Sequence, residues 1–182
     1  VLQSELLDLK VPNKGRAVGV VIESGVESGK GAVATILITE GQLKKGDLII
    51  VGEEFGKARI LMNENNLKLD FVTPSMPVKV FGLSSTPNSG DEMIVVNNEK
   101  QGKEISSLRK DRNRANKLND QQLLKMKNFM DQNMDSSNKT VSLIVKADVH
   151  GSVEAIRDSL LKLSTDDVEV DIISSGVGGI SE

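Results

Sequence analysis

The stretch Ser24–Ala32, with the sequence SGVESGKGA, comes closer than any other part of the chain to a nucleotide-binding motif. A phosphate-binding loop needs two glycines separated by four residues, then Lys and a Ser or Thr, because backbone amides wrap the phosphates and the hydroxyl binds magnesium. Here three residues separate Gly25 from Gly29, and Lys30 is followed by Gly31, which has no hydroxyl. The next residues are β-branched and predict a strand, whereas a helix follows a phosphate loop. We expect a glycine-rich connection between strands; a phosphate-handling enzyme is the alternative.

No other set of residues predicts catalysis. A nucleophile needs an activating base beside it, and His150, the single histidine, stands in the run ADVHGSVEA without an identified Ser or Cys partner. The adjacent pairs Glu53–Glu54 and Asp166–Asp167 point to opposite faces of an extended chain, so neither forms a shared acid–base dyad locally. We expect no catalytic residue, no metal site and no cofactor in this chain.

Composition limits the class of protein. The 182 residues include no Cys and one His, which excludes disulfides and Cys-ligated zinc or iron–sulfur sites. The first ten residues lack the order of a signal peptide, and no run approaches the roughly 20 apolar residues that span a membrane. We therefore expect a cytoplasmic protein with no membrane partner. Four Phe are the only aromatic residues, so aliphatic side chains must build the core and little material remains for stacking platforms.

Short strands separated by turns predict a small β-barrel or sandwich between residues 15 and 100. The connections EGQLKKGD, NENN and PNSGD carry the Gly, Asn, Pro and Asp residues that turns prefer. In the second strand, even-numbered residues from Ala32 to Ile38 share one face, and the pattern leaves open which face is buried. The expected strands are Arg16–Glu23, Ala32–Thr39, Asp47–Val51, Lys57–Met62, Val78–Leu83 and Glu92–Val96.

Helical patterns precede and follow this β-rich part. Residues 1–10 place Leu2, Leu6 and Leu9 at helical spacing, and Pro12 ends the pattern. Residues 101–137 predict a connector of two helices, the second capped by Asn119 or Asp120. Its 8 basic and 5 acidic residues suit either RNA phosphates or a solvated linker. One stripe of the second helix holds Leu123, Met126, Met130 and Met134, with Phe129 beside it.

Residues 138–182 predict an α/β unit. Val141–Ala147 and Val168–Ile173 are typical of strands, and Ser152–Leu163 has helical spacing. Strands that alternate with a helix favour a parallel βαβ unit. Two strands and one helix do not complete a domain, so we expect this unit to be truncated and the natural protein to continue.

Several segments resemble one known family. The run GQLKKGDLIIVG resembles the signature of the second-domain barrel of translational GTPases, and PNSGD is similar to a later turn of that barrel. The segments SELLDLK, GVVIES and TPSMPVKVFGLS, and above all KADVHGSVEAIRDSLLKLS followed by SSGVGGISE, together resemble bacterial translation initiation factor two. The resemblance extends in order over essentially all 182 residues.

The resemblance implies a multidomain fragment. Residues 1–14 would be the last helix of an upstream GTP-binding domain, 15–100 a second-domain β-barrel, 101–137 a helical connector, and 138–182 the start of an α/β/α domain. The intact factor would bind GTP and magnesium, bring formylmethionyl initiator tRNA to the small ribosomal subunit and promote subunit joining. The nucleotide motifs and the tRNA-binding domain are absent from these residues. The fragment would therefore dock on the ribosome and couple domain movements without hydrolysing GTP.

Candidate contacts with ribosomal RNA (rRNA) follow from charge, because the resemblance assigns none. Four barrel cations lie on or next to turns, and four more cluster in the connector: Lys44, Lys45, Lys57, Arg59, Arg109, Lys110, Arg112 and Arg114. Surface solubility explains each cation singly at least as well. Two other interpretations stay open, namely a barrel and linker module of another translational GTPase, and a structural spacer that does not associate with ribosomes.

Overall fold

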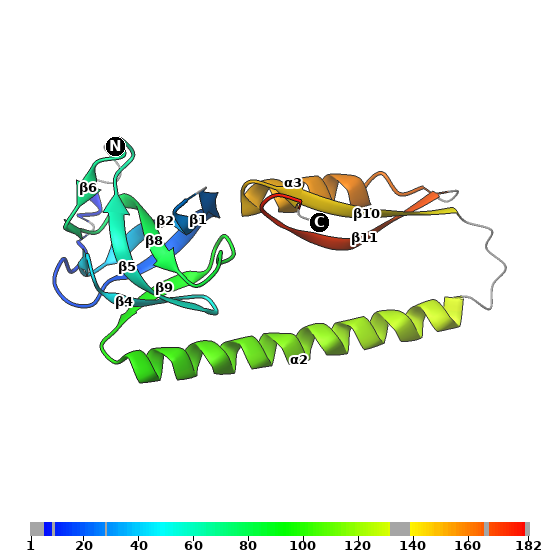
Figure 1. Cartoon of the computed structure of the whole chain (residues 1–182), viewed down its shortest axis with the longest axis horizontal. Coiled ribbons are helices and arrows are strands. Elements are labelled where there is room, and N and C mark those ends of the chain that lie inside the picture. The colour runs from blue at the N-terminus through cyan, green and yellow to red at the C-terminus, as the bar shows by residue number, and fades with distance from the viewer. Residues whose placement is uncertain (1–5, 9, 28, 132–138, 166–167, 181–182) are drawn as a thin grey trace.

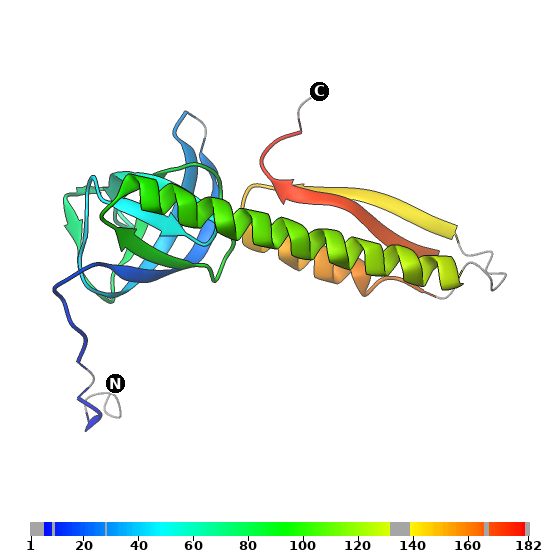
Figure 2. The same ribbon diagram turned by 90° about the horizontal axis from the view of Figure 1, so that it is seen from below.

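The computed structural model describes residues 6–8, 10–27, 29–131, 139–165 and 168–180, which form a β-barrel, a long helix and an α/β unit (Figure 1). The chain leaves the barrel along the helix and returns through the α/β unit, so that one end of this unit lies beside the barrel (Figures 1 and 2). The helix predicted at residues 1–10 falls largely outside the described residues. Of its three leucines only Leu6 is described, and this side chain is exposed.

The barrel is a closed antiparallel sheet. β1 (Val18–Glu27) pairs with β2 (Gly31–Glu40), β2 with β8 (Pro77–Leu83), and β8 with β5 (Glu54–Met62). β5 continues to β4 (Leu48–Val51), β4 to β9 (Glu92–Val96), and β9 returns to β1. The six predicted strands are therefore confirmed. Three two-residue strands were not predicted: β3 (Leu43–Lys44) lies within the predicted turn EGQLKKGD, and β6 (Lys68–Leu69) and β7 (Phe71–Val72) lie in a stretch to which we assigned no element.

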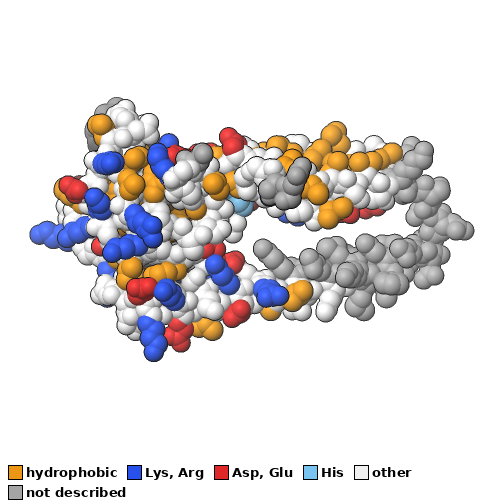
Figure 3. Space-filling model, in the orientation of Figure 1, with side chains coloured by type: hydrophobic (Ala, Val, Ile, Leu, Met, Phe, Trp, Pro, Cys, Tyr) orange, Lys and Arg blue, Asp and Glu red, His pale blue; other side chains and the backbone are white. Residues whose placement is uncertain are grey.

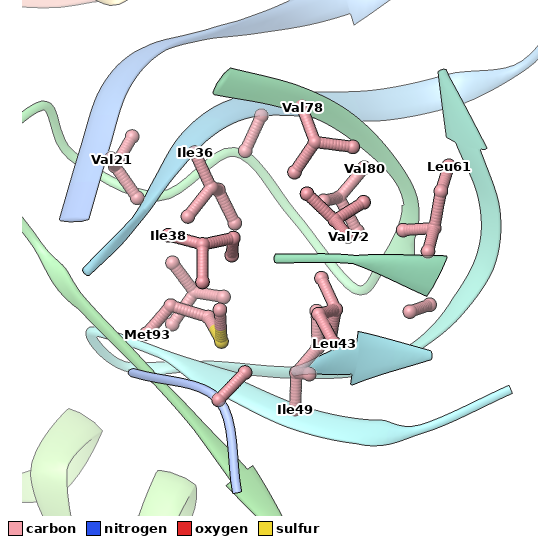
Figure 4. Packing of buried hydrophobic residues seen from close by; sticks show 14 of the residues in the cluster. Val21, Ile36, Ile38, Leu43, Ile49, Leu61, Val72, Val78, Val80 and Met93 are labelled. Atoms are coloured by element: carbon pink, nitrogen blue, oxygen red, sulfur yellow. The ribbon is translucent and has the colours of Figure 1, made fainter. Parts of the chain in front are cut away.

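Aliphatic side chains fill the barrel, as composition predicts (Figure 4). In β2 the even-numbered face is the buried one, since Ala34, Ile36 and Ile38 are fully buried. Side chains from β4, β8 and β9 meet this face, and Met93 fills the space beside Ile38 (Figure 4). Such a core holds the surface turns in fixed positions, because close-packed interiors deform little.

A single helix, α2 (Glu99–Asp131), replaces the two helices that we predicted for the connector. It begins earlier than predicted, where the Asn98 side-chain oxygen accepts a hydrogen bond from the Lys100 amide at 2.9 Å. Asn119 and Asp120 do not begin a second helix, because residues 103–120 contain neither Pro nor Gly and the backbone hydrogen bonds of α2 continue through them. The 33 residues give a length of about 50 Å. The predicted methionine stripe involves side chains outside the described residues.

The α/β unit has the predicted parallel βαβ order. β10 (Lys139–Ala147) pairs in parallel with β11 (Val168–Val177), and α3 (His150–Leu161) connects them. Val153 of α3 and Val145 of β10 are buried between the helix and the strands, whereas Ile144 and Ile173 are exposed. In the part of the chain that the structure describes, no helix combines the length and apolar character needed to cross a bilayer.

Candidate nucleic-acid interface and barrel junctions

The glycine-rich segment forms a hairpin and not a phosphate loop. β1 ends at Glu27 and β2 begins at Gly31, and Gly29 and Gly31 have positive φ angles of 77° and 81°. The Lys30 ammonium lies 2.9 Å from the Glu27 carboxylate and 5.1 Å from the centroid of the Phe81 ring. The connection between strands is thus as predicted, and its lysine charge is already paired within the hairpin.

The four predicted barrel cations meet on one surface. The turn after β3 lies against β5, because the Gly46 amide donates to the Ala58 carbonyl at 2.8 Å and the Ala58 amide donates to the Asp47 carbonyl at 2.9 Å. Ala58 is fully buried, so Lys57 and Arg59 on either side of it point outward. We name this the barrel cation surface and define it as Lys44, Lys45, Lys57 and Arg59.

Within the barrel cation surface, Lys57 lies directly beside the turn that contains Gly46. A Cβ atom built on Gly46 would lie 3.9 Å from Cε of Lys57, so the Lys57 stem passes beside the turn that carries Lys44 and Lys45. All four side chains are exposed, and none of them forms an ion pair within 4.0 Å among the described residues. Lys and Arg side chains gather over the barrel in the space-filling view (Figure 3). Their charge is available to an external anion.

The four connector cations divide into two pairs. The Arg109 guanidinium donates to the Gly52 carbonyl at 2.6 Å, and the Lys110 ammonium lies 2.9 Å from the Glu54 carboxylate. Both partners belong to the hairpin between β4 and β5, so these two cations hold α2 against the barrel. Arg112 and Arg114 are exposed and form no ion pair with the described residues. The eight predicted contacts therefore do not form one cluster.

A stripe of small and polar residues on α2 forms the junction with the barrel. Gly102, Ser106, Arg109 and Asn113 follow one another at helical spacing and face the β4–β5 hairpin. The Ser106 hydroxyl donates to the Glu53 carbonyl at 2.5 Å, and the Asn113 amide donates to the Glu53 carboxylate. At Gly102 a Cβ would lie only 2.5 Å from Cε2 of Phe55. The sequence patterns missed this stripe because it is not apolar; its only signal is the spacing of small residues.

A polar cavity of about 500 Å³ lies beside this junction. Burial raises the pKa of the Asp91 carboxyl and the Glu53 charge acts in the same direction, whereas a hydrogen bond from the Asn88 amide at 2.8 Å opposes the shift. Arg109 also lines the cavity and lowers this pKa by its charge. The remaining lining residues are Gly52, Glu92, Arg112, Asn113 and Asn116.

A second junction joins the barrel to the α/β unit. Val149, just before α3, forms an antiparallel bridge with Gly25 of β1, and a Cβ on Gly25 would lie 2.9 Å from the Asp148 carbonyl oxygen. Next to it, His150 Nδ1 lies 3.7 Å from the Glu154 carboxylate and has no hydrogen-bond partner among the described residues. A cavity of about 230 Å³ lies at this contact. The predicted pair Asp166–Asp167 is outside the described residues.

Comparison with protein families defines the class. A model described as elongation factor G domain 2 matches residues 16–96, which are the barrel, and a model described as translation-initiation factor 2 matches residues 115–182. The chain is therefore a translation-factor barrel followed by a segment typical of initiation factors.

Individual relatives identify the family. The chain is 47% identical over all of its 182 residues to translation initiation factor IF-2 of Buchnera aphidicola subsp. Schizaphis graminum and of Francisella tularensis subsp. tularensis. It belongs to the translation initiation factor 2 family. It spans 21% and 22% of the length of these two relatives. The interpretation as a module of another translational GTPase is not supported, because the match to initiation factors covers the whole chain.

Solved structures overlap the chain partially. GDP-bound aIF5B from Aeropyrum pernix covers 96% of this chain at 21% identity and a TM-score of 0.49, and the chain covers 28% of that protein. A bacterial selenocysteine-specific elongation factor, EF-Sec, covers 52% of the chain at 18% identity and a TM-score of 0.42. The assignment to the family rests on the sequence comparisons.

Proposed function

We propose that this chain docks a translation initiation factor on the RNA of the small ribosomal subunit and couples its barrel to the domain that follows. Family membership supports a role on the ribosome. The observation that carries the docking role is the barrel cation surface, where four exposed cations lie together and form no ion pair with the described residues. Phosphates of a folded RNA would neutralise these charges and release counterions.

The size of the salt effect follows from the number of cations. Each neutralised phosphate contributes a slope of roughly −0.7 to −0.9 in log affinity against log salt. Four contacts therefore predict a slope near −3, and a fourfold rise in salt would weaken binding roughly 50- to 150-fold. Arg112 and Arg114 would add to this slope only if α2 also reaches RNA. Arg109 and Lys110 should add less to the salt slope, because their charged groups already contact the Gly52 carbonyl and the Glu54 carboxylate.

The coupling role is supported by the two junctions. Arg109 and Ser106 fasten the first turns of α2 to the β4–β5 hairpin, and the bridge from Val149 to Gly25 returns the α/β unit to β1. A displacement of the barrel on the ribosome would therefore be transmitted to the α/β unit by two routes. In the longer factor we propose that GTP and magnesium bind upstream of these residues, and that initiator tRNA is bound by a domain downstream.

Binding to isolated bacterial small ribosomal subunits tests the docking role. Affinity is measured at several salt concentrations for the wild type and for Lys44→Ala, Lys57→Ala and the double variant. Each substitution should weaken binding at low salt and reduce the slope by roughly 0.7 to 0.9. Lys146→Ala, which removes an exposed charge from β10, is the matched control and should leave the slope unchanged.

Two outcomes would contradict the proposal. A flat salt response of the wild type would show that phosphate contacts do not carry the binding. No association at any salt would favour the spacer interpretation. Titration of the chain with GTP and magnesium should show no binding, and tight binding would revive the phosphate-loop alternative.

A further inference from the structure

One aromatic ring is exposed beside the barrel cation surface. In the ribbon of β3 and β7, Leu43 and Val72 are buried, whereas Lys44 and Phe71 are exposed, and 55% of Phe71 is accessible. Lys44 and Phe71 are direct partners in the antiparallel pairing. Directly opposite residues project from the same face of a ribbon and lie about 5 Å apart at Cβ. Phe71 is therefore a neighbour of the turn that carries Lys44 and Lys45.

The exposure of Phe71 contrasts with the other rings that the structure describes. Phe81 is only 2% accessible, and Phe55 is half-buried against Gly102 of α2. The Lys30 ammonium over Phe81 is the single cation–π contact in the described part of the chain, so no cation there covers Phe71. Single exposed apolar side chains are common on protein surfaces, so it is the group of cations beside Phe71 that distinguishes this ring.

The surroundings of Phe71 favour an anionic partner. Lys44 and Lys45 belong to the turn, Lys57 lies beside it, and β6 adds the exposed Lys68. Two carboxylates lie nearby. That of Asp47 accepts the Lys44 amide at 2.8 Å and so stabilises the turn itself. Asp70 is exposed, and its backbone carbonyl accepts the Lys45 amide at 2.9 Å. Cations thus outnumber carboxylates around the ring.

We propose that Phe71 is a stacking platform for an unpaired RNA base whose flanking phosphates are bound by Lys44, Lys45 and Lys57. This inference rests on the proposed RNA-docking function and adds that the RNA at this contact is a loop, bulge or strand end. A duplex offers no free base face, whereas an unstacked base presents a π surface that an aromatic ring can cover. A protein partner would instead have to bring carboxylates to the four lysines around the ring.

Stacking and phosphate contacts have separable signatures. Loss of base stacking on an aromatic residue weakens binding roughly 5- to 150-fold at every salt concentration, because no counterion is released. Loss of a lysine changes the salt slope. Phe71→Ala should therefore lower affinity for small ribosomal subunits at all salt concentrations while the slope stays at the wild-type value, and Lys44→Ala should reduce the slope.

A fluorescent variant tests the contact directly. The chain contains no Trp and no Tyr, so Phe71→Trp introduces a single indole at the proposed platform. Addition of a short oligoadenylate should quench this fluorescence, whereas inorganic polyphosphate, which has phosphates but no bases, should not. Leu108→Trp places an indole at another exposed position, on α2, and serves as the control, with no quenching expected from the same oligoadenylate.

Three variants at one position separate stacking from apolar contact. With small ribosomal subunits, Phe71→Trp should retain or increase affinity, and Phe71→Ala and Phe71→Leu should both reduce it. An affinity of Phe71→Leu equal to the wild type would overturn the proposal, because an apolar protein contact tolerates Leu. Equal affinities for Phe71→Ala and the wild type would also overturn the stacking proposal. In that case a steep salt response of the wild type would still support RNA docking. A salt-insensitive wild type would overturn both. Circular dichroism confirms that each variant retains the barrel.

Discussion

Replacing Gly102 by Ala tests the junction between α2 and the barrel, because two effects of opposite sign meet at this residue. Ala in a helix interior is more stable than Gly by about 1 kcal/mol. Against this, the new Cβ would lie 2.5 Å from Cε2 and 2.8 Å from Cδ2 of Phe55. Ordinary contacts begin near 3.4 Å, so either the ring or the helix must move by roughly 1 Å.

The clash should outweigh the gain in helix propensity. Overpacking of this size costs about 1 to 3 kcal/mol, and the half-buried Phe55 ring can yield only in part, since Val96 lies 3.2 Å from the same Cβ position. The sum predicts that Gly102→Ala changes the free energy of unfolding by between roughly 0 and 2 kcal/mol in the destabilising direction. In a Phe55→Ala background the clash is absent, and the same substitution should stabilise by about 1 kcal/mol.

Four proteins complete the measurement, namely the wild type, both single variants and the double variant. Urea unfolding followed by circular dichroism gives the coupling energy between the two sites, which should be about 1 to 3 kcal/mol. Because the chain has several units, hydrogen exchange of residues 99–110 is measured as well, and Gly102→Ala should accelerate it only where Phe55 is present. Equal stabilisation by Gly102→Ala in both backgrounds would show that the helix does not contact Phe55 closely.

Two further predictions concern Asp91 and Gly25. The pKa of Asp91 is raised from 3.8 by burial, so its contribution to stability is present below pH 3.8 and is lost as the pH rises through the folded-state pKa. Asp91→Asn carries no charge, so at neutral pH it should unfold at a higher urea concentration than the wild type. This difference in urea midpoint should shrink as the pH falls toward 3.8, and a constant difference would contradict the raised pKa of Asp91. Gly25→Val should separate the turn before α3 from β1, because its Cβ would approach the Asp148 carbonyl. Since the chain lacks native Cys, spin labels on Cys at Glu64 and Asp158 should report a longer or broader distance distribution, and an unchanged one would refute the contact.

Sequence reasoning recovers the barrel because its six main strands are long enough to show periodicity and are separated by turn residues. The even-numbered face of β2 becomes the core only through closure of the sheet, which one strand does not specify. The strands β3, β6 and β7 have two residues each, too few for any period. β3 and β7 form only by pairing with each other, as between Leu43 and Val72, which are 29 residues apart, whereas β6 pairs with the nearby end of β5.

The sequence predicts where the candidate RNA-binding cations are, but not which of them are already bound within the protein. Arg109 and Arg112 are three residues apart in the sequence, and composition treats them alike. Only the folded helix shows that Arg109 meets the Gly52 carbonyl while Arg112 stays exposed. Likewise Lys57 meets the turn of Lys44 and Lys45 only because the antiparallel pairing of β4 and β5 brings β5 back beside that turn. The exposure of Phe71 has no sequence signal, since an alternating pattern of two residues cannot show which one is buried.

The polar character of the α2 junction matters for coupling. An apolar stripe would bury the helix firmly, whereas hydrogen bonds exchanged with water contribute only about 0.5 to 1.5 kcal/mol each. The contacts from Ser106, Arg109 and Asn113 to the β4–β5 hairpin together give a junction of a few kcal/mol, which can open and form again. Beyond Asn113, α2 continues for about 27 Å, so a tilt of roughly 10° at the junction moves its far end by about 5 Å. The bridge between Gly25 and Val149 resists that movement at β1. In the proposed docking role, weakening both junctions would release the α/β unit while the barrel stays on the ribosome.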